Sequence, residues 1–250
     1  TDTPPDPGEA ARSAAVVRVL DGDSVALLID GVEREARLIG VNAPERDECW
    51  GPEARERFAT VARGTVTFET DVEATDQYDR LLVYLWTTDG TFINADLAAT
   101  GDVIARAFPP NTTRQDPIDE AGMAAQASGE GMWSGCASSA AGIALAEVNA
   151  DPPGPDEEAL RDEWVAFTAT ADTDLSGWTL RDGSTANRYT FPDGTRIPAG
   201  GRLTIRTGCG ADSTTDLHWC SGTPIWNNAG DEVILTDAEG LIVLAEEYGG

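Results

Sequence analysis

Lysine is absent from this chain of 250 residues, and its 17 basic residues are all arginines against 44 acidic residues, a formal net charge of −27. A basic groove that holds nucleic acid through many phosphate contacts cannot be built from this composition. The charge is spread evenly, −14 over residues 1–137 and −13 over residues 138–250. We interpret the acidic surface as adaptation to a saline habitat; a cation-dependent site is the functional alternative.

Histidine and long apolar runs are also scarce. The one histidine, His218, stands beside Trp219 and Cys220 and is expected to be an ordinary loop residue. No His-based triad, H-E-x-x-H motif or phosphate-binding glycine loop is present, so catalysis must use carboxylates, arginines and a metal. No run approaches 18 apolar residues, which argues against a membrane span, and an apolar content of 41% argues against wholesale disorder.

Cysteine occurs four times, and the even count with no C-x₂-C pair favours two disulfides within the domains over a zinc site. Two free buried thiols are the alternative for the first pair. Disulfides predict an oxidising compartment. The chain starts at Thr1, and its polar segment TDTPPDPGEA is expected to remain after removal of an export signal or to mark an engineered start. We therefore expect a secreted protein or, alternatively, one anchored at the cell surface.

β-Branched runs dominate the first half after a stub at 1–13 that is expected to be disordered. Strands are predicted at 15–20, 24–30, 32–41, 66–74 and 80–87, with a hairpin turn at Asp30-Gly31. Helices are predicted at 51–64, 92–101 and 117–128. Five strands interrupted by helices indicate a small closed antiparallel barrel in a domain covering 14–137.

The second half contains strand patterns only, after a featureless linker at 138–142. Strands are predicted at 143–150, 163–170, 175–183, 188–194, 201–208, 231–237 and 240–248. Turn signals recur at a spacing of roughly 8–12 residues, which is typical of a β-sandwich. The predicted fold class is therefore mainly β, with a barrel domain and a sandwich domain at 143–250.

Polar residues that could form a reaction site gather in the first half. They are Asp21 and Asp23 at one corner, Arg37 on a strand, Asn42 and Glu45 in the loop after it, and Asp76, Tyr78 and Arg80 before another strand. Oxygen ligands without thiolate or imidazole suit a hard cation such as Ca²⁺. Two arginines beside a cation would bind a phosphate at any usable pH. Singly, each feature also fits a turn, a surface strand residue or a local salt bridge.

Five segments in order resemble the staphylococcal nuclease (thermonuclease) family over nearly all of residues 14–136. They are VVRVLDGDSVALLIDGVEREARLIGVNAPE, GPEA, TDQYDRLLVYLW, ADLAATGDVIARAFPPN and GMWSGC. The resemblance implies an OB-fold barrel with helices and a nuclease that uses Ca²⁺ to hydrolyse DNA and RNA to 3′-phosphates and 5′-hydroxyls.

The resemblance also implies a role for each matching residue. Asp23 corresponds to the family's Ca²⁺-binding aspartate, with Asn42 and the Ala43 carbonyl completing the shell and Asp21 behind it. Arg37 and Arg80 correspond to its phosphate-binding arginines, and Glu45 to the carboxylate that orients or deprotonates water. Tyr78 and Phe108 correspond to residues that contact the substrate. Cys49 and Cys136 correspond to a disulfide of secreted relatives, and the other two cysteines would pair as Cys209–Cys220.

Asn42 departs from the family, whose members commonly carry Asp at this position. A neutral amide replaces an anionic ligand, so we expect weaker Ca²⁺ binding, partly offset by the negative field of the domain, rather than loss of activity. The missing lysines leave substrate attraction to arginines and cations. Little base specificity is expected, because Tyr78 can stack on any base.

Residues 143–248 resemble a lamin-tail domain, an Ig-like sandwich. The resemblance rests on EWVAF, LSGWTLRDG, RYTFPDG, IPAGG and IWNNAGDEVILTDAEG. It predicts a fold and leaves spacer, cell-surface docking and partner recruitment open as functions. Trp164, Trp178 and Trp226 are expected to pack in the core and loops rather than to stack on bases.

The sequence therefore predicts a secreted, monomeric, Ca²⁺-dependent, sugar-nonspecific nuclease with an appended lamin-tail domain. DNA and RNA are the expected substrates. The alternatives are a catalytically impaired module that binds nucleic acid or a protein partner, marked by Asn42, and a structural extracellular protein whose second domain sets its role. Retention of Asp23, Arg37, Glu45 and Arg80 together disfavours impairment.

Overall fold

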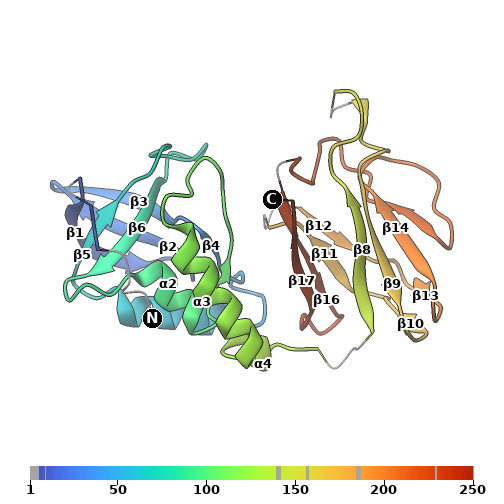
Figure 1. Cartoon of the computed structure of the whole chain (residues 1–250), viewed down its shortest axis with the longest axis horizontal. Helices are drawn as coiled ribbons and strands as arrows, with labels where there is room; N and C mark the ends of the chain where they lie inside the picture. The colour runs from blue at the N-terminus through green and yellow to red at the C-terminus, as the bar shows by residue number, and fades with distance from the viewer. Residues whose placement is uncertain are drawn as a thin grey trace. The chain divides into compact units, whose positions relative to one another are not determined.

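The chain folds into two compact units, residues 1–136 and 137–250, which are described separately (Figure 1). The computed structural model describes residues 6–8, 10–138, 142–155, 158–183, 187–228 and 230–249. Residues 1–5 and 9 of the predicted stub and residues 139–141 of the predicted linker lie outside the described residues. Within the described ranges, no helix is long and apolar enough to cross a membrane.

The first unit is built on a closed barrel in the order β1-β2-β3-β6-β5. Its strands are β1 (Arg12–Val19), β2 (Ser24–Ile29), β3 (Val32–Leu38), β5 (Thr65–Glu69) and β6 (Leu81–Thr87). Asp30 and Gly31, both at positive φ, form the predicted turn between β2 and β3. Strand β1 begins three residues earlier than predicted, because Arg12 already pairs with Phe68 of β5.

The barrel is closed as predicted, but the prediction that all its strands are antiparallel was wrong. Strands β3 and β6 run parallel, with Ala36 opposite Leu81 and Leu38 opposite Val83. Five strands in a closed ring cannot alternate direction at every seam, so at least one pair must be parallel. A parallel pair needs a long crossover connection, which helix α1 (Gly51–Val61) and strand β5 provide.

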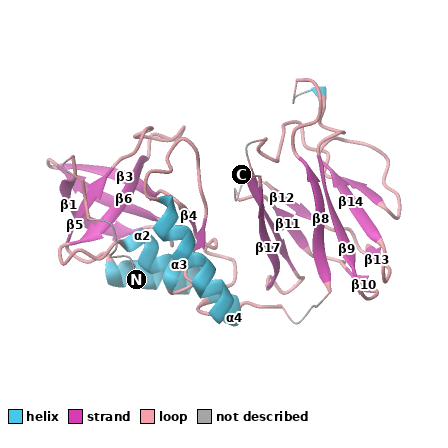
Figure 2. Ribbon diagram, viewed as in Figure 1, coloured by secondary structure: helices cyan, strands magenta, loops and turns pink. Residues whose placement is uncertain are grey.

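Three helices gather on one side of the barrel: α1, α2 (Ile93–Ala99) and α3 (Gln115–Ser128) (Figure 2). They contribute Phe58, Leu97 and Ile118 to one core with the barrel strands, and all three side chains are fully buried. Three short elements escaped prediction: the pair β4 (Val41–Asn42) and β7 (Ile104–Ala105), and helix α4 (Met132–Gly135).

The second unit is a sandwich of two four-stranded sheets, β12-β11-β16-β17 and β15-β14-β9-β8, with a small pair β10-β13 (Figure 1). The strands of the two large sheets are β8 (Ile143–Asn149), β9 (Trp164–Ala169), β11 (Thr179–Arg181), β12 (Arg188–Thr190), β14 (Arg202–Arg206), β15 (Asp216–His218), β16 (Asp231–Thr236) and β17 (Ile242–Tyr248); the small pair is β10 (Thr173–Asp174) and β13 (Arg196–Ile197). Their inner faces share one apolar core.

Two predictions for this unit need correction or refinement. His218 ends strand β15 instead of lying in a loop, and its ring faces Asp212 with Nδ1 3.1 Å from the carboxylate. Strand β15 pairs in parallel with β14. The local sequence pattern around His218 does not indicate this pairing. Trp178 and Trp226 are buried in the core as expected, whereas Trp164 is half-buried beneath the Arg202 guanidinium.

Asn94, at the start of α2, joins three segments of the first unit through its buried amide. Its Oδ1 accepts the Leu85 N–H at 2.9 Å, and its Nδ2 donates to the Ile39 carbonyl at 2.8 Å. Because Asn94 is fully buried, these backbone groups have no access to water if the amide is removed.

Asn94→Ala is therefore expected to lower the free energy of unfolding by about 3 kcal/mol, since it leaves a buried N–H and a buried C=O without partners. Chemical denaturation of both proteins measures the difference. The control is Met123→Ala on exposed α3 surface, which should change stability by less than about 0.5 kcal/mol. Equal effects of the two substitutions would contradict the role assigned to Asn94.

Candidate active site

The corner between β1 and β2 places two carboxylates beside the barrel. Asp23 is buried, and its amide N–H donates to Asp21 Oδ1 at 3.1 Å, which fixes the corner. Its own carboxylate accepts from Ser24 Oγ at 2.9 Å and from the Ala43 N–H at 3.1 Å. Burial raises the pKa of Asp21, and the neighbouring charge of Asp23 raises it further. The corner therefore concentrates negative charge where little water screens it.

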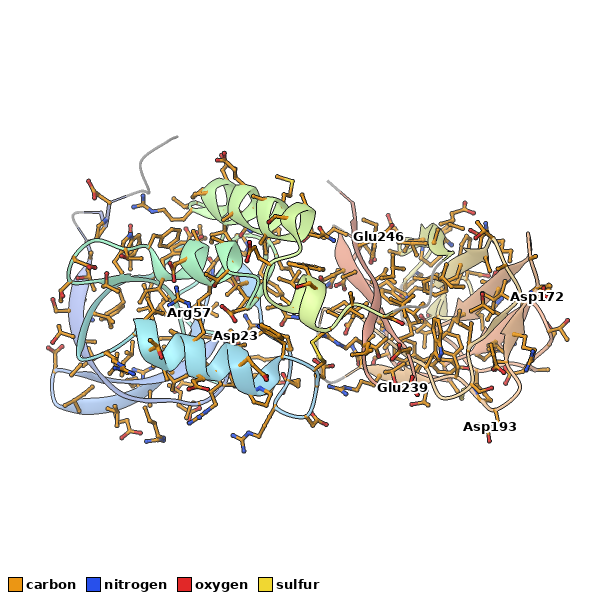
Figure 3. All side chains as sticks on the ribbon, turned by 90° about the horizontal axis from the view of Figure 1, so that it is seen from below. Asp23, Arg57, Asp172, Asp193, Glu239 and Glu246 are labelled. Atoms are coloured by element: carbon orange, nitrogen blue, oxygen red, sulfur yellow. A yellow bond between two sulfur atoms is a disulfide. The ribbon has the colours of Figure 1, made fainter. Side chains whose placement is uncertain are left out.

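Gly22 explains why the corner can lie so close to α1. A Cβ at Gly22 would stand 2.6 Å from Cβ of Ala43 and 2.9 Å from Cβ of Ala54. The loop after β4 and helix α1 therefore both approach this residue to van der Waals contact. Figure 3 shows Asp23 beside α1 within the first unit.

Arg37, near the end of β3, reaches the same corner. Its Nη2 lies 3.0 Å from Asp23 Oδ2 and 3.1 Å from Asn42 Oδ1, so one nitrogen bridges two of the predicted metal ligands. Its Nη1 donates to the carbonyls of Leu38 and Val41. The side chain is 17% exposed, which leaves the guanidinium fixed but accessible on one side.

The oxygen atoms around Arg37 are chemically suited to a hard cation. Asp23 supplies a carboxylate and Asn42 an amide oxygen, and the backbone carbonyls of Leu38 and Val41 also face Arg37; these are donor types that Ca²⁺ takes. The predicted third ligand, the Ala43 carbonyl, follows Asn42 in the chain, and the Ala43 N–H donates to Asp23. A positive nitrogen already stands between the Asp23 and Asn42 oxygens. The buried Nδ2 of Asn42 has no hydrogen-bond partner among the described residues, so the structure uses this side chain only through its oxygen. Those residues include no group of three His, Cys, Asp or Glu side chains able to hold a metal. A Ca²⁺ ion bound here would therefore depend on neutral oxygen ligands in addition to the one carboxylate of Asp23.

Arg80 is held by a separate carboxylate. Asp76 accepts from Arg80 Nε at 2.8 Å and from the backbone N–H groups of Tyr78 and Arg80. Burial opposes ionisation of Asp76, but the hydrogen bonds from Arg80 hold its pKa below the ordinary value. Tyr78 is 70% exposed, and its ring centroid lies 5.6 Å from the Arg80 guanidinium. An exposed aromatic ring beside an oriented guanidinium can stack on a base and contact its phosphate.

The barrel register relates Arg80 to Arg37. Leu82 of β6 is the partner of Arg37 in the parallel pair, and Arg80 comes two residues before it. Alternate residues of a strand share a face. Arg80 directly precedes β6, and the strand alternation continued by one residue puts it on the face of Arg37, about 7 Å away along the strands. Phe108 joins this group from the segment after β7, with its ring 5.3 Å from the Arg37 guanidinium and 4.9 Å from that of Arg106.

Glu45 lies in the loop between β4 and α1 and is half-buried. Its N–H donates to a Glu48 carboxylate oxygen at 2.8 Å, and its carbonyl accepts the Glu48 N–H. A Cβ on Gly51 would stand 1.9 Å from this carbonyl, so only glycine fits where the loop turns into α1.

Of the predicted site residues, Asp21, Asp23, Arg37, Asn42, Ala43 and Phe108 are joined by contacts into one cluster. Tyr78 and Arg80 form a second group, related to the first by strand register. Glu45 is placed three residues after Asn42 by its loop.

Both predicted disulfides are present, Cys49–Cys136 and Cys209–Cys220. The first fastens the end of the Glu45 loop to the segment after α4. Trp50 adds a second attachment, because its Nε1 donates to Asp102 Oδ1 at 2.9 Å and its ring packs against Gly135. Sequence reasoning missed this attachment, whereas it offered the local salt bridge of Asp76 with Arg80 as an alternative, and that ion pair is present. The only sequence signal for the Trp50 attachment was that Trp50 directly follows Cys49, which forms the disulfide.

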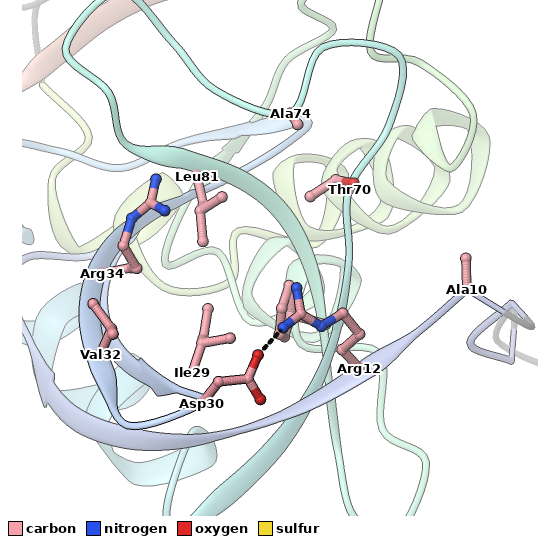
Figure 4. Close-up of a pocket in the computed structure, with 10 residues that line it drawn as sticks. Ala10, Arg12, Ile29, Asp30, Val32, Arg34, Thr70, Ala74 and Leu81 are labelled. Atoms are coloured by element: carbon pink, nitrogen blue, oxygen red, sulfur yellow. Dashed lines mark hydrogen bonds and ion pairs between the residues drawn. The ribbon is translucent and has the colours of Figure 1, made fainter.

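A pocket lies at the opposite end of the β2–β3 hairpin from Asp23 and Arg37 (Figure 4). It has a volume of about 450 Å³, with Ile29, Val32 and Leu81 among its lining residues and the Arg12–Asp30 ion pair at its edge. None of the predicted site residues lines it. The candidate chemistry therefore belongs to the corner at Asp23.

Comparison with known proteins agrees with the resemblances that the sequence indicated. Residues 35–135 match the family described as "Staphylococcal nuclease homologue", and residues 137–250 match the "Lamin Tail Domain". The thermonuclease of Staphylococcus intermedius is 34% identical over 129 residues, 49% of this chain and 76% of that protein. The thermonuclease of Staphylococcus hyicus is 34% identical over 128 residues, 48% of this chain and 74% of that protein.

A more partial match is the micrococcal nuclease of Shigella flexneri, 35% identical over 80 residues, 30% of this chain and 43% of that protein. The chain belongs to the staphylococcal nuclease family, with a lamin tail region after the nuclease-like domain. The predicted fold class, mainly β with an OB-fold barrel and an Ig-like sandwich, is confirmed.

Asp102, the acceptor of the Trp50 hydrogen bond, supplies a pH-dependent test of its own burial. Burial raises its pKa despite hydrogen bonds from Thr100 and Trp50. Because the folded-state pKa is raised, the native state is favoured below the unfolded-state pKa, and this advantage is lost as the pH rises through the folded-state pKa. Relative to Asp102→Asn, which does not titrate, the wild type should gain stability as the pH falls. Urea unfolding at a series of pH values measures this difference; a difference independent of pH would contradict the prediction.

Proposed function

We propose that the first domain is a secreted, Ca²⁺-dependent nuclease that hydrolyses phosphodiester bonds of DNA and RNA to 3′-phosphate and 5′-hydroxyl products. The observation that carries the proposal is the bridge of Arg37 between Asp23 and Asn42, with Arg80 on the same barrel face. Relatives named thermonuclease and micrococcal nuclease support it. Two disulfides fit an oxidising compartment and hence secretion.

The proposed roles follow from the charge that develops during hydrolysis. Water attacks phosphorus, the P–O5′ bond breaks, and negative charge grows on the non-bridging oxygens. Arg37 and Arg80 stabilise that charge through oriented N–H donors. In this proposal Glu45 takes the proton of the attacking water, and the departing O5′ takes up a proton from solvent.

Asp23, Asn42 and the Ala43 carbonyl would hold Ca²⁺, which when bound neutralises phosphate charge as a Lewis acid. Arg37 donates to the side-chain oxygens of Asp23 and Asn42, so these two residues would be shared between the guanidinium and a bound cation. Tyr78 and Phe108 would flank the nucleotide as stacking surfaces. Neither ring offers a pattern of hydrogen bonds that selects a base, so the cleavage should be weakly sequence-dependent.

Cleavage of single-stranded DNA tests the proposal. The wild type should cleave with Ca²⁺ and lose activity in EDTA, and Arg37→Ala should lower kcat by about a hundredfold or more, because a transition-state donor is removed. Arg18→Ala is the control, since Arg18 forms an exposed ion pair with Glu33 away from the site. Cleavage that survives both EDTA and Arg37→Ala would refute the proposal.

A catalytically impaired binding module is the second candidate, favoured by the neutral amide at Asn42. Asn42→Asp separates the two, because it adds an anionic ligand at a buried position. If the site is active, this variant should reach half-maximal activity at a Ca²⁺ concentration roughly tenfold lower. The measurement is a Ca²⁺ titration of the cleavage rate. A wild type that binds DNA without cleaving it at any Ca²⁺ concentration would favour the binding module.

A further inference from the structure

A pocket of about 370 Å³ adjoins the candidate active site at the N-terminal end of α1 and is lined by two arginines. Its lining residues are Asp21, Arg46, Gly51, Pro52 and Arg55. It shares Asp21 with the corner that holds Asp23, and Arg46 directly follows Glu45. The pocket therefore borders the proposed reaction site through Asp21, yet no proposed role uses Arg46 or Arg55.

These arginines differ from most others because neither forms an ion pair with any residue that the structure describes. Elsewhere in the described residues of this acidic protein, ion pairs join arginines to carboxylates, among them Arg18, Arg57 and Arg114. Arg46 has no carboxylate within 4.0 Å among the described residues, and Arg55 has none either. With 44 acidic residues for 17 arginines, partners are abundant. Two guanidiniums without carboxylate partners in one pocket therefore form a local positive region.

Arg55 is also oriented. Its Nε donates to the Leu20 carbonyl and its Nη2 to the Val19 carbonyl, both at 3.2 Å. These contacts fix the guanidinium against the end of β1 and leave Nη1 for another acceptor. Arg46 is exposed and can turn toward the same pocket. The lining carries two positive charges against the one carboxylate of Asp21, so the balance favours an anion.

We propose that this pocket binds a backbone phosphate of the polynucleotide, next to the phosphodiester held by Arg37 and Arg80. The inference rests on the proposed nuclease function and adds a substrate preference to it. A strand that passes through the site would contact Arg46 and Arg55 only if it extends beyond the scissile phosphate. The enzyme therefore favours oligonucleotides over substrates with a single phosphodiester, and the gain arises from binding.

The test compares wild type with the double variant Arg46→Gln, Arg55→Gln on two substrates. For a single-stranded DNA of about twelve nucleotides, KM should rise roughly tenfold with little change in kcat, because the charge-assisted hydrogen bonds to phosphate are removed. For a dinucleotide with one phosphodiester, KM should stay unchanged. Arg63→Gln is the matched control, because Arg63 is exposed, has no carboxylate partner among the described residues and does not line the pocket.

Binding measured without cleavage separates this proposal from the proposed function. Fluorescence anisotropy of a labelled DNA of the same length, in EDTA, should show weaker binding by the double variant and a salt slope reduced by about 0.7 for each phosphate that the variant no longer neutralises. Weaker binding with no cleavage by either protein would refute the nuclease and leave the pocket standing. Equal KM and equal Kd for the double variant and Arg63→Gln would refute the pocket.

Arg46→Gln alone guards against a folding effect, because its side chain makes no hydrogen bond or ion pair among the described residues. It should retain the wild-type unfolding midpoint and show part of the rise in KM. A single variant as active on the long substrate as wild type, together with a double variant that is merely less stable, would also overturn the proposal.

Discussion

The geometry of the candidate site depends on one guanidinium, that of Arg37. Its four hydrogen-bonding contacts join the corner before β2, the end of β3 and strand β4. The Asp23 carboxylate adds a second link between the corner and the loop after β4, because it also accepts the Ala43 N–H. The ion pair with Asp23 is nearly buried, where an unpartnered charge is costly. Folding therefore places a positive charge between two oxygens that are suited to a cation.

The same charge balance gives meaning to the extreme acidity of the chain. A protein with 44 acidic residues and no lysine cannot attract nucleic acid through its whole surface. The acidic composition is nevertheless compatible with a small region in which each arginine pairs with one carboxylate or, among the described residues, with none. Arg37 and Arg80 occupy such positions on the barrel, and Arg46 and Arg55 extend the region past Asp21. The surrounding negative field raises the local concentration of cations, which compensates in part for the neutral amide of Asn42.

Much of this arrangement could be predicted from the sequence, since local patterns determine it. The Asp30-Gly31 turn and the alternating and helical patterns predicted most barrel strands and helices to within a few residues. The parallel seam between β3 and β6 was missed because each strand shows the same alternation in either direction. Strand β15 was missed because its pairing with β14 depends on contacts distant in sequence.

The candidate site shows the same division. Motif order brought Asp23, Arg37 and Asn42 together in the prediction, and they are in contact. The attachment of Trp50 to Asp102 and the pocket at Arg46 depend on side-chain directions after folding. Neither composition nor spacing specifies them. Gly22 and Gly51 are similar cases. The close contacts that leave no room for a side chain at these positions form only when the neighbouring loop and helix are in place.

The most direct test of the account is an NMR titration of the wild type with Ca²⁺, followed through backbone amide signals. Because the Ala43 N–H donates to Asp23, its signal should shift with saturation, together with those of Ser24 and Asn42. Asp23→Asn should abolish these shifts. Shifts that instead spread without saturation over the exposed acidic residues, and that persist in Asp23→Asn, would contradict the placement of the cation and with it the proposed mechanism.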